Sequence, residues 1–110
     1  MTFQTIDIDQ GKRLIDEKEV IIVDVRDAAS YILAHIENAR HIHDSNVEEF
    51  VESADKSRPL LVYCYHGHTS RGAAEYFANT GFQDVYSLDG GFESWRCTYP
   101  VMNSDQISAA

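Results

Sequence analysis

Apolar residues are grouped along the chain in short runs that alternate with segments of helical spacing. Two runs, at 20–25 (VIIVDV) and 60–64 (LLVYC), are almost continuous and largely aliphatic, which is typical of strands covered on both faces. Weaker runs at 5–8, 39–43 and 84–88 predict three further strands. The pattern therefore predicts an α/β fold with a five-stranded, mostly parallel sheet.

The segments between the runs predict helices that flank this sheet on both faces. Asp9, Asp27 and Asn46 each precede a helical pattern and carry side chains suited to capping its first turn. For Asn46, Glu49 three residues later would complete a capping box. A fourth helix is expected over about 71–79, followed by Gly81 and its left-handed backbone.

The remaining segments complete a single domain over residues 1–100. In the helix after Asp27, Tyr31 and Ile32 are expected to face the core, and DGGFESW (89–95) predicts a turn into a short helix. Residues 101–110 are small and polar, which indicates a flexible C-terminal tail.

Charge and composition narrow the classes of partner. The 110 residues carry nine Lys and Arg against eighteen Asp and Glu, a formal charge of -9. Such a balance argues against nucleic acid and against anionic membrane surfaces. No apolar run approaches the roughly 20 residues that span a bilayer. Two distant cysteines, Cys64 and Cys97, suit reduced thiols in a cytoplasmic protein.

One cysteine stands in a setting that favours reactivity. Cys64 ends the 60–64 run, where the carboxyl edge of a parallel sheet binds ligands. The backbone amides that follow and the next helix N-terminus would lower the pKa of its thiol. The candidate anion-binding residues are Tyr65, His66, Gly67, His68, Thr69, Ser70 and Arg71. Cys97 has no such setting and is interpreted as structural or incidental.

Four segments in order resemble the rhodanese family of sulfurtransferases, over the chain up to about Pro100. VIIVDVRD resembles a strand ending in Asp-x-Arg, here Asp24 and Arg26. AHIENARHI resembles a His-Ile segment, although Glu37 and Asn38 replace the Pro-Gly common there. CYHGHTSRGAA resembles the active loop, and LDGGFESW the terminal Gly-Gly turn with its tryptophan.

The resemblance, which is closest to single-domain thiosulfate sulfurtransferases, implies a mechanism. Cys64 would take the outer sulfur of thiosulfate, release sulfite and hold a persulfide. Cyanide in vitro, or a thiol or a dithiol such as a thioredoxin-like protein, would then accept the sulfur. The resemblance implies no metal and no organic cofactor. Asp24 and Arg26 would form an ion pair that supports the loop, either as a structural salt bridge or as a substrate contact.

Three alternatives remain open at this point. A Cys-dependent phosphatase or arsenate reductase would need an arginine six residues after the cysteine, where Ser70 stands. A second alternative is a protein of the same fold that only carries sulfur or only binds a partner. Such a protein would not catalyse sulfur transfer by itself. The pairs His41, His43 and His66, His68 could approach a metal, although no familiar ligand set is complete. His35 is interpreted as a hydrogen-bonding residue at a helix end.

Overall fold

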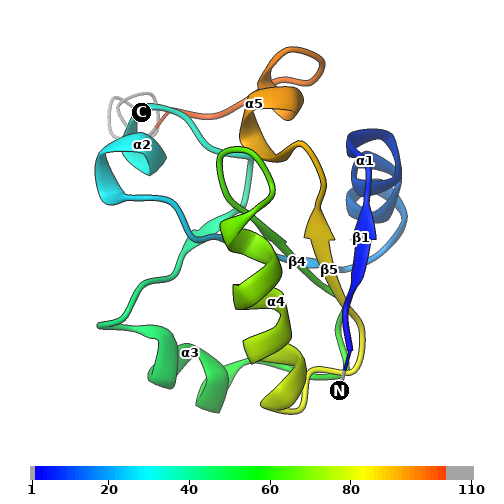
Figure 1. The fold of residues 1–110 in the computed structure, drawn as a ribbon, viewed down its shortest axis with the longest axis vertical. Helices are drawn as coiled ribbons and strands as arrows, with labels where there is room; N and C mark the ends of the chain where they lie inside the picture. The colour runs from blue at the N-terminus through cyan, green and yellow to red at the C-terminus, as the bar shows by residue number, and fades with distance from the viewer. Residues whose placement is uncertain (1, 104–110) are drawn as a thin grey trace.

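Residues 2–103, described by a computed structural model, form an α/β fold around one sheet (Figure 1). The five strands found in this range are ordered β1-β5-β4-β2-β3, and every neighbouring pair is parallel. The predicted sheet is therefore confirmed. The strands are β1 (Gln4–Ile6), β2 (Ile21–Asp24), β3 (Arg40–His41), β4 (Leu60–Tyr63) and β5 (Val85–Leu88). The helices between them are α1 (Ile8–Glu17), α2 (Ala28–Leu33), α3 (Val47–Ser53), α4 (Thr69–Asn79) and α5 (Gly91–Arg96).

The central strand β4 is buried on both faces, as its unbroken apolar sequence requires. Alternate side chains of a strand point to opposite faces. Leu60 and Val62 pack in a core with α3 and α4, whereas Leu61 and Tyr63 pack in a second core with α5 and the apolar side of α1. Helices thus cover both faces of the sheet, and β4 ends in the middle of its carboxyl edge.

The N-terminal boundary differs from the prediction. Strand β1 ends at Ile6, and Asp7 rather than Asp9 caps α1. The Asp7 carboxylate accepts the Gln10 amide at 2.8 Å, while the Gln10 side chain accepts the Asp7 amide at 3.0 Å. This reciprocal capping box satisfies two free donors of the first turn, which the single cap at Asp9 would not.

The capping box predicted at Asn46 is wrong. The Asn46 side chain accepts the His43 amide at 2.7 Å and donates to the His41 carbonyl at 2.9 Å. It makes no capping bond to α3. Because these partners lie before the helix, Asn46 closes the turn after β3 instead of the first turn of α3.

Helix α2 faces the core with one of the two residues expected to do so. Asp27 caps it, as predicted, and accepts the Ser30 amide. Tyr31 packs against the core shared with α5 and donates its hydroxyl to the Ala39 carbonyl at 2.7 Å. Ile32 is 48% exposed, so its predicted burial is wrong. A helix that ends at Leu33 has too few turns to bury a second stripe.

Left-handed backbone occurs at Gly81 and at Asn38, among other positions. Gly81 follows the end of α4 with φ +111°, as predicted. Asn38 has φ +70°, a conformation that glycine adopts without the strain a side chain brings. Asn38 therefore adopts a conformation that suits glycine, the residue that the resemblance leads one to expect there.

The chain keeps contact with the domain past the predicted boundary at residue 100. Val101 packs against the core, and Met102 exchanges two backbone hydrogen bonds of 2.8 Å with His35. The flexibility predicted for the tail otherwise concerns 104–110, which lie outside the described residues, and stays a prediction. Across residues 2–103, each helix is too short or too polar to cross a bilayer.

Candidate active site

Cys64 lies directly after β4, with its sulfur against the amides of the following loop. Its Sγ accepts hydrogen bonds from the backbone N–H of Gly67 and of Ser70, each at 3.2 Å. The residue is buried, with 5% of its surface exposed. We call residues 64–70 the Cys64 loop. It places one sulfur at the meeting point of inward-turned amides.

Gly67 lets the loop curl around the sulfur. Its φ is +99°, and a Cβ there would lie 3.1 Å from the Gly90 nitrogen and 3.2 Å from the Leu88 oxygen. Any side chain would therefore be strained and would press on the segment after β5. Gly72, in the first turn of α4, is different, because nothing lies within 4 Å of a Cβ added there.

The first turn of α4 uses the sulfur as its cap. The helix begins at Thr69, two residues before the prediction, and His68 at the cap position offers no side-chain bond to it. The N–H of Ser70, a donor that has no partner inside the helix, points instead to Cys64 Sγ. A helix N-terminus favours negative charge nearby, so α4 stabilises a thiolate.

Helix α5 fixes the other side of the Cys64 loop. The Phe92 amide donates to the Cys64 carbonyl at 2.9 Å, and the Glu93 amide donates to the Tyr65 carbonyl at 3.0 Å. In a trans peptide the next N–H points opposite to the carbonyl. The amides of Tyr65 and His66 therefore point away from α5. Gly91, with φ +59°, permits this approach.

These contacts set the acidity of the thiol. Burial of Cys64 disfavours the charged sulfur and raises its pKa. The Ser70 side chain and the amides of Ser70, Gly67 and His66 outweigh burial and lower the pKa below its ordinary value. The sulfur is thus held toward the thiolate, which is the reactive form, by hydrogen bonds rather than by a cation.

The other predicted anion-binding residues have exposed side chains. Arg71 lies on the outer side of the first turn of α4, half exposed, with its Nη2 3.6 Å from Asp89 Oδ1. This separation makes a weak ion pair that leaves the guanidinium accessible. The exposed residues of the loop itself are Tyr65, His66, His68 and Thr69.

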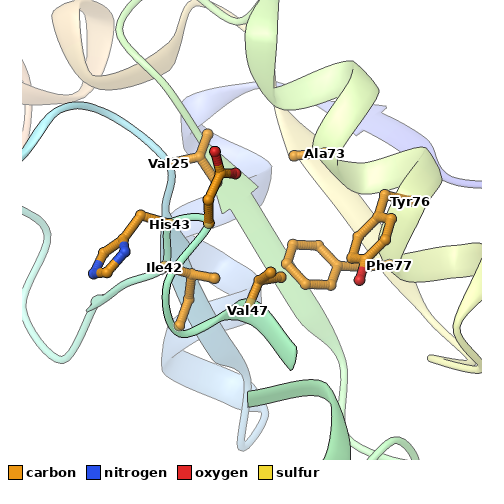
Figure 2. A pocket seen from close by; sticks show the side chains of 8 residues that line it. Val25, Ile42, His43, Val47, Ala73, Tyr76 and Phe77 are labelled. Atoms are coloured by element: carbon orange, nitrogen blue, oxygen red, sulfur yellow. The ribbon is translucent and has the colours of Figure 1, made fainter. Parts of the chain in front are cut away.

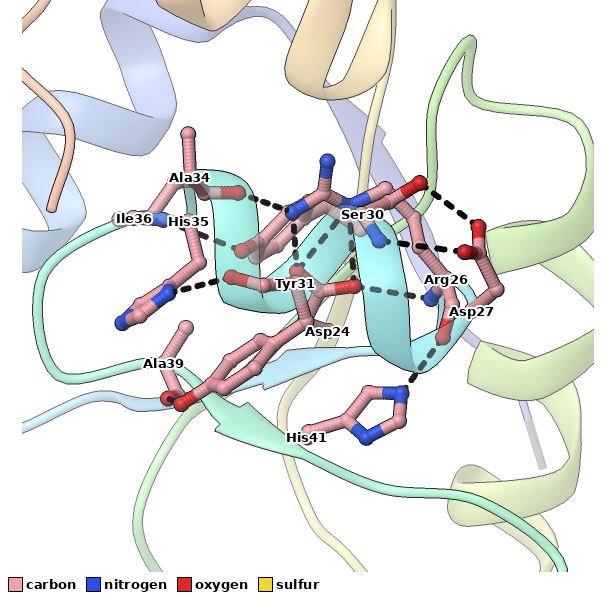
Figure 3. A network of polar contacts seen from close by, with 11 residues as sticks. Asp24, Arg26, Asp27, Ser30, Tyr31, Ala34, His35, Ile36, Ala39 and His41 are labelled. Carbon is pink, nitrogen blue, oxygen red and sulfur yellow. Dashed lines mark hydrogen bonds and ion pairs between the residues drawn. The ribbon is translucent and has the colours of Figure 1, made fainter. Parts of the chain in front are cut away.

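Asp24 and Arg26 form a buried ion pair beside the loop (Figure 3). Arg26 Nη2 lies 2.7 Å from Asp24 Oδ2, and it also donates to the Ala34 carbonyl at 2.6 Å. The guanidinium carbon lies 4.0 Å from the Phe92 ring centre and 5.5 Å from that of Tyr65. Burial disfavours the charged form of Arg26 and lowers its pKa. The hydrogen bonds and the negative charge of Asp24 outweigh burial, so the pKa of Arg26 is raised. The two charges are matched to each other, and the guanidinium lies next to the Tyr65 ring of the Cys64 loop.

His41 and His43 bond to backbone groups near the end of β3. His41 hydrogen-bonds the Arg26 carbonyl through Nε2 at 2.6 Å, and His43 accepts the Ser45 amide at 3.2 Å. His35 bonds the Tyr31 carbonyl at the end of α2, as predicted. Within residues 2–103, no three His, Cys, Asp or Glu side chains converge as metal ligands.

A separate groove of about 430 Å³ lies beside the loop (Figure 2). It opens between α4, the start of α3 and the ends of β2 and β3, and its lining contains no residue of the Cys64 loop. The groove is therefore separate from the residues that donate to the Cys64 sulfur. The groove is lined by Val25, Ile42, His43, Asp44, Val47, Ala73, Tyr76 and Phe77.

Residues 7–97 match the rhodanese-like domain family. The chain belongs to this family. It is 50% identical to a protein named thiosulfate sulfurtransferase GlpE from Pseudomonas paraeruginosa, over 94% of this chain and 93% of that protein. A Vibrio cholerae protein of the same name is 44% identical over 90% and 94% of the two chains. A rhodanese-related protein from Thermoplasma volcanium has a similar structure, with a TM-score of 0.77 and 27% identity over 91% and 98% of the two chains.

This rhodanese-like domain contains site residues that the sequence did not single out. The amides of Phe92 and Glu93 hold the loop carbonyls, and Ser87 on β5 contacts Ser70. The Gly-Gly pair before Phe92 was a visible signal of a tight approach. No local signal marks Ser87, because its role depends on the pairing of β5 with β4.

Proposed function

We propose that this chain is a thiosulfate sulfurtransferase in which Cys64 carries the transferred sulfur. The observation that carries the proposal is the position of Cys64 Sγ, 3.2 Å from the amides of Gly67 and Ser70. The names of the relatives from Pseudomonas paraeruginosa and Vibrio cholerae support the choice of thiosulfate. Anion-binding amides around a thiolate suit a reaction in which the sulfur stays negative throughout.

The first half-reaction transfers a sulfur atom to the protein. The Cys64 thiolate attacks the outer sulfur of thiosulfate, a sulfur–sulfur bond forms, and the bond to the sulfonate sulfur breaks. Sulfite leaves with the electron pair, so the total charge is unchanged. The amides of the Cys64 loop stabilise first the thiolate and then the terminal sulfur of the persulfide. Arg71, exposed beside this loop, attracts the dianion against the net charge of -9.

The second half-reaction regenerates the free Cys64 thiolate. An acceptor attacks the outer persulfide sulfur, and the Cys64 thiolate leaves with the electron pair. Cyanide gives thiocyanate in the test tube. A thiol, or a dithiol protein of thioredoxin type, would be the acceptor in the cytoplasm, where reduced cysteines such as Cys64 and Cys97 persist.

Intact-protein mass spectrometry after exposure to thiosulfate tests the proposal. The protein should gain about 32 Da, and cyanide or a dithiol should remove the added mass. Cys64→Ser should show no adduct and no thiocyanate formation. Cys97→Ser, which changes the exposed cysteine, should behave like the unaltered protein.

Three other results would contradict the proposed sulfurtransferase activity. A Cys64→Ser variant that still makes thiocyanate would exclude Cys64 as the sulfur carrier. An adduct that forms but passes its sulfur to no small acceptor would indicate a carrier that serves a single partner. A phosphoryl adduct, with hydrolysis of p-nitrophenyl phosphate, would indicate a phosphatase.

A further inference from the structure

Two buried serine hydroxyls meet beneath the Cys64 loop. Ser70, in the first turn of α4, and Ser87, on β5, have no exposed surface. Their Oγ atoms lie 2.8 Å apart. Ser87 pairs with Val62 in the sheet, two residues before Cys64. The pairing of β4 with β5 therefore brings a hydroxyl from a distant part of the chain to the residue that caps the sulfur.

The two hydroxyls share two protons, and the direction of their hydrogen bond decides where the second proton points. If Ser70 donates to Ser87, the Ser70 oxygen has no proton left for another acceptor. If Ser87 donates to Ser70, the Ser70 proton is free for a second partner. Ser70 lies against the sulfur, because its backbone N–H donates to Cys64 Sγ at 3.2 Å. Its side chain also lowers the pKa of Cys64, as a donor to the sulfur would. A negative sulfur therefore favours the arrangement in which Ser87 donates.

We propose that Ser87 is a positioning residue for sulfur transfer, because it donates to Ser70 and thereby directs the Ser70 hydroxyl to Cys64 Sγ. This inference rests on the proposed role of Cys64. The relay stabilises the thiolate before the attack and again when Cys64 leaves from the persulfide. Because both serines are fully buried, water cannot replace Ser87 as the donor, and each hydrogen bond acts in a medium of low polarity.

Charged groups near the loop do not duplicate this relay. The hydrogen bonds to Cys64 Sγ come from the amides of Gly67 and Ser70, whereas the Asp24 carboxylate and the Arg26 guanidinium are matched to each other. Arg71 and Asp89 are exposed and face each other. The titratable groups to consider in a pH experiment are Tyr65, His66 and His68 in the loop, Arg71 on α4, Asp89 after β5, and Asp24 and Arg26 after β2.

A double-mutant cycle on the thiol pKa tests the relay without any substrate. In a Cys97→Ser background, the rate of Cys64 alkylation by iodoacetamide is measured against pH for Ser70→Ala, Ser87→Ala and the double variant. Ser70→Ala should raise the thiol pKa by about one unit, and Ser87→Ala by about half a unit. The double variant should match Ser70→Ala alone, because Ser87 acts only through Ser70.

An additive double variant, or an unchanged pKa in Ser87→Ala, would overturn the proposal. Ser87→Thr and Ser87→Val form a matched pair of equal shape, in which only valine lacks the hydroxyl. If Ser87→Ala does not fold, the valine variant should show the raised pKa and the threonine variant should not. Ser53→Ala, which removes a hydroxyl on α3, should leave the thiol pKa unchanged.

The cycle is independent of sulfur transfer. If Cys64 forms no persulfide but the serine variants shift its pKa as expected, the proposed function fails and the relay stands. If the persulfide forms and the serine variants leave the thiol pKa unchanged, the relay fails and the proposed function stands.

Discussion

The backbone N–H of Phe92 donates to the carbonyl oxygen of Cys64 at 2.9 Å. The first turn of α5 therefore holds the backbone of the cysteine to which we assign the sulfur transfer. This contact fixes the direction of the carbonyl and, through the planar peptide bond, of the next amide. The inward amides of the loop are a consequence of how the last helix packs.

Gly91→Ala should disrupt this contact. A Cβ at Gly91 would lie 2.5 Å from the Tyr65 oxygen and 2.6 Å from the Cys64 oxygen, on a backbone with φ +59°. We expect a loss of about 2 kcal/mol in the free energy of unfolding, from urea denaturation. Thiocyanate formation should fall at least tenfold, because the amides no longer point at the sulfur.

Gly72→Ala is the matched control for that glycine change. Nothing lies within 4 Å of a Cβ at Gly72, which is exposed in α4. Alanine should stabilise the protein by roughly 0.5–1 kcal/mol and leave turnover unchanged. Equal losses in the two variants would show that the turn before α5 has no special role.

The lowered pKa of Cys64 predicts a pH dependence with a definite sign. Between the folded pKa and the unfolded value of about 8.5, the unfolded state binds more protons. The free energy of unfolding should therefore rise with pH across this window, and this contribution is lost as pH falls through the folded pKa. Denaturation of the unaltered protein and of Cys64→Ser, each at several pH values, should show this slope only where the thiol is present.

Arg71→Ala should raise the KM for thiosulfate about threefold to tenfold and leave kcat nearly unchanged. Arg71 is half exposed and 3.6 Å from Asp89, so its role is to attract the dianion before reaction. Added salt should reduce the difference between the two proteins. Arg96→Ala, which removes an exposed arginine paired with Glu93, should have no effect. A KM that does not move in Arg71→Ala would make that residue a surface charge only.

Arg26→Met distinguishes a structural ion pair from a substrate contact. It leaves the Asp24 carboxylate buried without its partner, which should cost about 3–5 kcal/mol of stability. The double variant Asp24→Leu, Arg26→Met should lose less than the sum of the single changes. Thermal denaturation of the four proteins gives this comparison. A stable Arg26→Met protein with a raised KM for thiosulfate would instead assign Arg26 to the substrate.

Asn38→Gly should stabilise the loop before β3. Asn38 has φ +70°, where a residue with a Cβ is strained and glycine is not. We expect a gain of about 1 kcal/mol in unfolding free energy, and a loss of similar size for Asn38→Ala. The two changes should move the thermal midpoint in opposite directions. A glycine variant that is less stable would show that the Asn38 side chain itself holds the loop.

Errors in the predicted elements came from groups with more than one available partner. Asp7 and Asp9 both suit a cap, and Asp7 wins because Gln10 completes its capping box, a signal present in the sequence. For Asn46, nothing in the local sequence argued against a capping box. Its partners, the backbone of His41 and His43, depend on the turn that follows β3.

The order of short apolar runs and helical patterns determined the parallel sheet, because strands buried on both faces need continuous apolar sequence. It also placed Cys64 at the carboxyl end of a central strand, followed by a glycine and a helix. Only the tertiary structure decided that α5 amides hold the loop carbonyls and that Ser87 contacts Ser70. Those contacts join residues that are 17 or 28 positions apart, and no local pattern encodes the direction of a hydrogen bond between them.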